Sequence, residues 1–142
     1  MANAVYPIYK TALMSASANV SLTVNDATDG PFCSLIDTND VAYSAAHDFF
    51  NDVSAAVVGT TTRITNPTVG SVSAGTFDGD NVTFTAVTGD VSEALIIHRN
   101  NSGANTTWRL VVYLDTSVTG LPVTPNGGDI TVSWHASGIF SL

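Results

Sequence analysis

Short segments in which apolar and polar residues alternate recur along the second half of this chain, and they constrain its fold most. Residues 82–86, 108–114 and 130–134 each show this alternation. A period of two places every second side chain on one face of a β-strand. Turn-forming residues separate these segments, as in the Asn- and Gly-containing stretch 100–105. The pattern predicts an all-β, antiparallel fold, either a β-sandwich or a barrel.

The length of the chain, 142 residues, corresponds to a single domain. We expect an N-terminal arm or short helix over residues 1–20, followed by the β-sandwich domain over 21–142. Pro7 suits the first turn of a helix over 6–17, although an extended arm is the alternative. In such a helix Ile8, Leu13 and Met14 are expected on one face.

A second short helix is predicted over 44–50, because Ser44 is an acceptable N-cap and an acidic residue follows in the first turn. Further strands are expected over 20–24, 32–37, 60–65 and 94–99. The last of these should form a hairpin with the strand that follows it. The predicted architecture is thus a single β domain with one or two short helices.

In each predicted strand every second side chain should point inward, and these inward-facing positions define a candidate core. Trp108 and Trp134 occupy inward-facing positions together with aliphatic residues, so both are predicted to pack inside. The alternative is that they form a sugar-stacking platform with Tyr113. The predicted core residues are Leu35, Phe84, Leu95, Ile97, Leu110, Val112, Val132 and Trp134.

Charged residues are few and mostly acidic, which limits the partners of this chain. Twelve Asp and Glu residues against four Lys and Arg give a net charge of −8, and only one lysine and one glutamate are present. Binding to a nucleic acid backbone needs a basic surface, so no nucleic acid partner is expected. No apolar run approaches the roughly 18 residues of a membrane span, and no signal peptide is recognisable.

The sequence also lacks recognisable catalytic, cofactor-binding or metal-binding motifs. The three histidines, His47, His98 and His135, are far apart in the chain, and nothing in their spacing brings them together. The acidic stretch 78–81 departs from the calcium-loop pattern and is predicted to be a turn. Cys33 lies in an apolar stretch, which is typical of a small core residue. We therefore expect no catalytic residue, no cofactor and no metal.

The segment 114–134, which reads LDTSVTGLPVTPNGGDITVSW, resembles small structural proteins of tailed bacteriophages that are often encoded near the major capsid protein. Residues 41–53, residues 76–90 with the apolar strand after them, and the apolar ending 138–142 fit the same family. The resemblance implies a non-enzymatic virion component on the capsid exterior, namely a capsid decoration (cement) protein.

This resemblance also implies partners. They are the major capsid protein and further copies of the chain, as a dimer or trimer. The apolar and aromatic N-terminal residues Tyr6, Ile8 and Tyr9 are the candidate capsid contacts, the alternative being that they pack on the domain's own core. Two other functions remain open: a receptor- or glycan-binding module of a tail fibre or tailspike, and a phage enzyme such as a depolymerase fragment.

Overall fold

The computed structural model describes residues 3–116 and 118–142, so the first two residues of the predicted arm lie outside the described residues. The helices are α1 (Pro7–Met14) and the short 3₁₀ helices η1 (Phe50–Asp52), η2 (Ser54–Ala56) and η3 (Asn105–Thr107). The strands are β1 (Ala4–Val5), β2 (Gly30–Ile36), β3 (Val57–Arg63), β4 (Thr68–Val69), β5 (Thr76–Asp78), β6 (Val82–Phe84), β7 (Ala94–Asn100), β8 (Arg109–Leu114), β9 (Ile130–Val132) and β10 (Phe140–Ser141).

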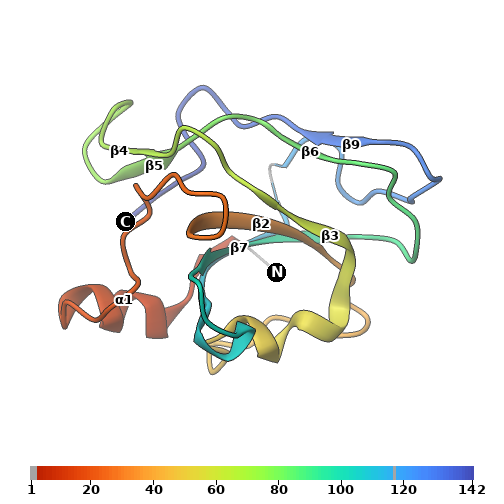
Figure 1. Cartoon of the computed structure of the whole chain (residues 1–142). Helices are drawn as coiled ribbons and strands as arrows, with labels where there is room; N and C mark the ends of the chain where they lie inside the picture. Colours follow the sequence, from red (N-terminus) through yellow and green to blue (C-terminus); the bar gives the residue numbers. More distant parts are fainter. Residues whose placement is uncertain (1–2, 117) are drawn as a thin grey trace.

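β7 lies in the middle of a five-stranded sheet with the order β1-β8-β7-β2-β3, in which all neighbours are antiparallel. All seven residues of β7 are buried. The sequence of a strand that is buried on both faces is a nearly continuous run of apolar residues, and not an alternation of apolar and polar residues. Figure 1 shows the two covering layers, with β4, β5, β6 and β9 above the central sheet and α1 and the helical turns near residue 50 below it.

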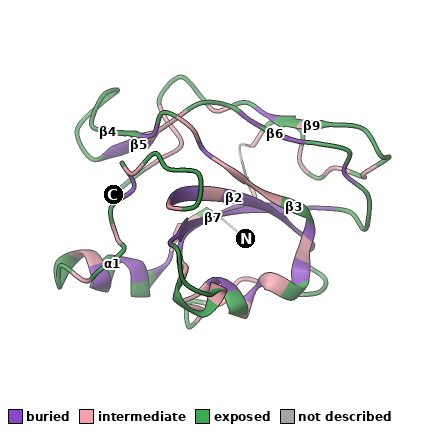
Figure 2. Ribbon diagram, viewed as in Figure 1, coloured by how far each residue is buried: buried purple, intermediate pink, exposed green. Residues whose placement is uncertain are grey.

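The outer β layer consists of two small sheets, β10-β5-β4 and β6-β9. In β6, Val82 and Phe84 are buried while Thr83 between them is exposed. Val82 pairs with Val132 of β9, which is also buried. Figure 2 shows this alternation of buried and exposed residues along β6. Two antiparallel β layers packed together, with one short α-helix, confirm the predicted sandwich.

The N-terminal segment is part of the central sheet. α1 begins at Pro7, whose fixed φ suits a first helical turn, and it buries Tyr9 and Ala12. Just before it, Ala4 and Val5 pair with the outer edge of β8. The predicted helix within 6–17 is therefore confirmed. The strand that precedes it extends the chain's own sheet.

The helix predicted over 44–50 is not formed, which corrects the sequence analysis. The backbone of this segment bonds to the start of β8 instead: Phe50 N donates to Trp108 O at 2.8 Å, and Leu110 N donates to Asp48 O at 2.9 Å. These groups are then not available for bonds along a helix. Helical turns begin only at Phe50, as η1 and η2.

The strand predicted over 20–24 is also absent, although Leu22 is buried. Side chains from other elements donate hydrogen bonds to carbonyl groups of this segment. The Tyr9 hydroxyl donates to Val20 O at 2.7 Å, and Arg99 Nε donates to Ser21 O at 2.5 Å. The alternating pattern therefore identified an inward-facing residue correctly, while its backbone is satisfied without strand pairing.

Seven of the eight predicted core residues are buried, and Trp134 is the exception. Trp134 follows β9 and is only half-buried, with its indole N–H donating to Asp80 O at 2.9 Å. Trp108, just before β8, is half-buried as well. The prediction that both tryptophans belong to the core is therefore wrong in part: each packs one side against it. Cys33 is fully buried, as predicted.

Candidate interaction surface

The three residues predicted to contact a capsid have different environments. Tyr6 and Tyr9 are buried, with 0% and 2% of their surface exposed. The Tyr6 ring packs against Tyr43 with 5.3 Å between ring centroids. For these two tyrosines the structure therefore shows the alternative, packing on the domain's own core. Ile8, which is 39% exposed, is the one of the three that a partner can readily reach.

A larger apolar surface lies between α1 and the C-terminal strand β10. Two hollows of about 280 and 320 Å³ meet there and share Leu13 and Leu142 in their walls. Met14, Leu142 and Val69 are exposed by 83%, 66% and 55%. We call this the α1–β10 surface and define it by Lys10, Leu13, Met14, Val69, Phe140 and Leu142.

The position of Ile8 on α1 separates it from this surface. Ile8 and Leu13 are five residues apart, which at 3.6 residues per turn places them about 140° apart around the helix. Neither hollow has Ile8 in its walls. The expectation that Ile8, Leu13 and Met14 share one face is thus corrected: Leu13 and Met14 belong to the α1–β10 surface, and Ile8 projects from another side.

The C-terminal residues complete this surface because β10 is held in register on β5. Phe140 pairs with Phe77, with 5.4 Å between ring centroids, and Leu142 N donates to Gly75 O at 3.1 Å. This pairing fixes the backbone and leaves the Leu142 side chain outside. Among the described residues that line the two hollows, Lys10 carries the sole charged side chain. The residues that line the two hollows are therefore mostly apolar and include no acidic side chain, in a chain that is otherwise strongly acidic.

A second constellation, which the sequence analysis did not predict, lies inside the central sheet. Ser34 Oγ is 2.9 Å from His98 Nε2, and His98 Nδ1 is 2.6 Å from Asn100 Oδ1. Because the Asn100 oxygen can only accept, Nδ1 carries the proton and Nε2 accepts from the Ser34 hydroxyl. The order of groups is that of a nucleophile, a base and an orienting residue.

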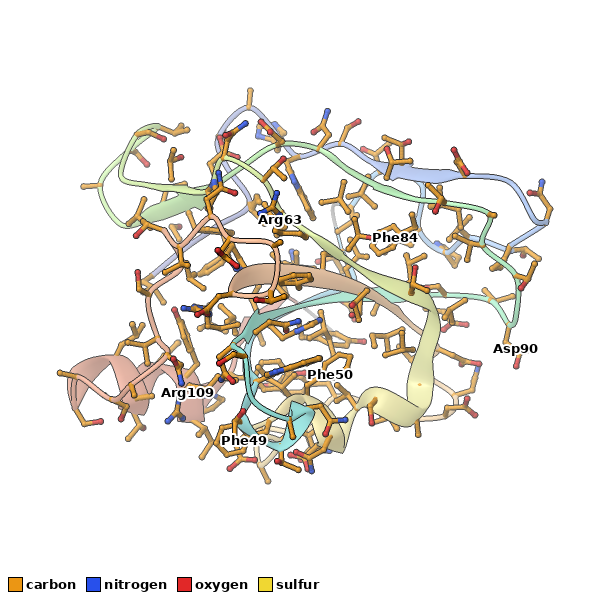
Figure 3. All side chains as sticks on the ribbon, in the orientation of Figure 1. Phe49, Phe50, Arg63, Phe84, Asp90 and Arg109 are labelled. Atoms are coloured by element: carbon orange, nitrogen blue, oxygen red, sulfur yellow. The ribbon has the colours of Figure 1, made fainter. Side chains whose placement is uncertain are left out.

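This Ser34–His98–Asn100 constellation is closed to a substrate in the structure. Ser34 and His98 have no exposed surface, and Phe50 covers the imidazole with 4.1 Å between ring centroids. Figure 3 shows Phe50 beneath the central sheet. Burial also lowers the pKa of His98 to about 3, which makes it a poor base at neutral pH. The arrangement satisfies buried polar groups and does not present a nucleophile.

Sequence reasoning missed this constellation because only strand pairing brings Ser34 near. His98 and Asn100 are two residues apart in β7, so they share a face, and this signal was visible. Ser34 is 64 positions away and pairs with Ile96, two residue pairs along from the pair that His98 makes with Phe32. Nothing local in the sequence indicates that register.

The remaining candidate residues lie apart from one another. His47 is half-buried, and His135 is exposed. In the turn over 78–81, Asp80 Oδ2 accepts bonds from Thr65 Oγ1 at 2.7 Å and Asn66 Nδ2 at 2.6 Å. Across residues 3–116 and 118–142, the structure contains no group of three His, Cys, Asp or Glu side chains able to hold a metal ion.

Comparison with models of known protein families and with curated proteins yields no match for this chain. Within the described part of the chain, none of the helices has both the length and the apolar character that crossing a membrane requires. The α1–β10 surface is accordingly the candidate site on which the functional argument rests.

Proposed function

We propose that this protein is a non-enzymatic structural protein of a tailed-bacteriophage virion. It binds the outer surface of the capsid through the α1–β10 surface and stabilises contacts between capsomers. Its partners are the major capsid protein and further copies of itself. The observation that carries the proposal is the α1–β10 surface, where Met14 and Leu142 stand largely exposed around two apolar hollows. The resemblance of residues 114–134 to phage structural proteins supports it.

Large exposed apolar side chains gathered in one place favour a protein–protein contact. Contiguous apolar patches on monomers commonly mark interaction sites, whereas scattered single residues need no explanation. A specific interface buries about 1,600 Å² in total, so this surface supplies the centre of a contact whose rim lies on neighbouring elements. Repetition over a closed shell then turns a modest contact into avidity.

The charge distribution agrees with a position outside the shell. A net charge of −8 repels packaged DNA, while the contact surface itself carries Lys10 and no carboxylate side chain. A contact between apolar groups is screened little by salt. Binding to the capsid should therefore change little between low and moderate ionic strength.

A glycan-binding module of a tail fibre or tailspike is the second candidate, and one observation favours it. A hollow of about 440 Å³ is lined by the half-buried rings of Phe32 and Trp108 together with polar groups of Thr61 and Asn101. Aromatic faces beside amide and hydroxyl groups suit sugar rings. However, the Trp108 N–H already donates to Asn101 O at 3.1 Å, which fixes the ring as part of the fold.

The test uses virions assembled without this protein, to which purified protein is added back. We expect such virions to release DNA at a lower temperature and to recover heat stability with the natural protein. The variant Met14→Ser/Leu142→Ser changes two exposed side chains and should bind at least about tenfold less tightly. Val91→Ser, an exposed apolar residue outside the surface, is the matched control and should restore stability fully.

Two results would overturn the proposal. If the double variant restores heat stability as well as the natural protein, the α1–β10 surface is not the contact. If virions without the protein keep normal heat stability but fail to adsorb to the host, the tail-fibre function replaces capsid decoration. Sedimentation of the protein with intact capsids, with and without added salt, measures the binding itself.

A further inference from the structure

A cleft of about 520 Å³ opens at the end of the central sheet where β2 and β8 end and β7 begins. Its walls are formed by Thr38, Ala42, Tyr43, Glu93, Tyr113, Asp115 and Pro122. Because β1 pairs Ala4 with Tyr113 and then runs antiparallel to β8, α1 leads away from this end of the sheet. The cleft is thus separate from the α1–β10 surface.

Two carboxylates face this cleft from different strands. Glu93, the single glutamate of the chain, is held in place by Thr38, whose backbone N–H and hydroxyl donate to Oε2 at 2.9 and 3.2 Å. Asp115 follows β8, and its backbone N–H donates to Asn3 Oδ1 at 2.9 Å. Hydrogen bonds thus fix the Glu93 carboxylate and the backbone at Asp115, so both residues are held at the wall of the cleft before any ligand arrives.

Tyr113 also lines the cleft, and both carboxylates act on its hydroxyl. Burial raises its pKa to about 12, and the negative charges of Asp115 and Glu93 and a hydrogen bond to the Asp115 side chain act in the same direction. Two carboxylates on separate strand ends therefore act on one point in the cleft. A group that binds there gains from carrying a positive charge.

Aromatic rings form the other part of the wall. The half-buried Tyr43 lies 5.3 Å from Tyr113, centroid to centroid, and 5.3 Å from Tyr6 on its other side. The Tyr6 hydroxyl is fully buried and has no hydrogen-bond partner among the described residues. Burial is the main cause that raises its pKa, and the neighbouring Tyr43 and Tyr113 add to the shift.

We propose that this cleft receives an arginine side chain of a partner protein. A guanidinium is planar and stacks on aromatic faces, and its N–H groups match carboxylates in a bidentate manner. Its charge also interacts favourably with the tyrosine faces. A neutral sugar gains nothing from the two negative charges. The inference goes beyond the capsid proposal and does not depend on it, because only the cleft carries it.

The experiment titrates the complete isotope-labelled protein with Nα-acetyl-arginine amide and follows the backbone amide signals by NMR. Nα-acetyl-citrulline amide is the neutral control, because it has nearly the same shape without the charge. We expect saturable shifts that concentrate at Thr38, Glu93 and Asp115. The citrulline compound should bind about fivefold to tenfold more weakly, as the combined ion-pair and cation–π contributions predict.

Variants separate this site from general attraction to an acidic protein. Glu93→Gln keeps an oxygen for the Thr38 bonds and removes one charge, so binding should weaken about fivefold. Asp90→Asn removes the same charge from an exposed loop residue outside the cleft, labelled in Figure 3, and should leave binding unchanged. If Glu93→Gln loses its dispersed spectrum, Asp115→Asn replaces it with the same expectation.

Several outcomes would overturn the inference. These are equal binding of the arginine and citrulline compounds, shifts spread evenly over the acidic surface, or equal weakening by Asp90→Asn and Glu93→Gln. Nα-acetyl-lysine amide tests the role of the planar group, and binding as tight as that of the arginine compound would contradict the stacking argument. None of these measurements involves capsids, so failure here and failure of the capsid proposal are distinguishable.

Discussion

The central sheet and the outer β layer differ in how many of their faces are covered. β7 in the central sheet is buried along all seven residues, because the outer layer covers one face and α1 with the 3₁₀ helices covers the other. β6 in the outer layer buries alternate residues only. On its open face Thr83 and Thr131 face each other across the strand pair, with 3.0 Å between their hydroxyl oxygens.

This difference shows what each kind of sequence pattern reports. In β6 alternation marks a strand with one face in water, and in β7 a continuous run marks a strand inside the fold. The segment 108–114 departs from this contrast, because residues 110–114 of β8 are all buried although the segment shows a period of two. A polar group in such a covered strand needs a hydrogen-bond partner inside the protein. In β7, His98 bonds to Ser34 and Asn100, while Arg99 bonds to Asp29 and Ser21 O. The covered sheet therefore contains both the fully buried strand β7 and the buried polar network.

The largest effect should come from shortening an isoleucine in each layer. Ile97→Ala, at a fully buried position of β7, should lower the free energy of unfolding by about 4 kcal/mol through lost burial and a cavity. Ile130→Ala, at a half-buried position of β9, should lower it by about 1–2 kcal/mol. Urea unfolding measures both. Equal losses would contradict the contrast between the two layers.

A smaller effect should appear as pH falls, and it tests the polar network of the central sheet. The pKa of His98 is about 3 in the folded protein against an ordinary value of 6.5. Below pH 6.5 the unfolded chain therefore takes up a proton that the folded protein does not, so folding loses stability as pH decreases. The loss from this group reaches about 2 kcal/mol at pH 5.

Urea unfolding of His98→Gln at pH 7 and pH 5 measures this contribution. The stability difference between the natural protein and the variant should shrink by about 2 kcal/mol at the lower pH. His135→Gln, at an exposed histidine, is the control and should leave the pH dependence unchanged. A pH dependence that is the same in the natural protein and in His98→Gln would show that His98 is not kept neutral by burial.

The smallest effect on the free energy of unfolding should come from replacing Trp134, which follows β9 of the outer layer. A fully buried tryptophan replaced by alanine costs about 3–5 kcal/mol, but Trp134 is only half-buried, so Trp134→Ala should cost about 1–2 kcal/mol. Thr131→Ala on the exposed face of the neighbouring strand should change stability by less than about 0.5 kcal/mol. A loss of 3 kcal/mol or more for Trp134→Ala would place this side chain in the core after all.

Much of the fold could be predicted because strand patterns are local. The alternations over 82–86 and 130–134 correspond to β6 and β9, and the apolar run 94–99 corresponds to β7. The hairpin of β7 and β8 was also predictable from the turn residues between them. The segment 44–50 failed as a helix because its backbone groups bond to β8, far along the chain, and no local rule describes that competition.

The candidate site was predictable only in part. The N-terminal segment was identified, but Tyr6 and Tyr9 are buried and Ile8 points away from the α1–β10 surface. The exposure of Met14 and Leu142 depends on which face of α1 the core takes and on where β10 pairs. The cleft of Glu93 and Asp115 likewise depends on which strand ends meet. These are consequences of packing, and side-chain periodicity does not contain them.

By itself, the sequence determined the class of fold, the acidic character of the chain and most of the core, because each depends on composition or on neighbours two to four residues apart. The tertiary structure alone decided which apolar residues stay outside, and it brought Ser34 to His98 and Glu93 to Asp115. In each of these pairs the two residues lie tens of positions apart in the sequence. They are set by the pairing of β2, β7 and β8, whose register follows from the whole packed core and not from any single segment.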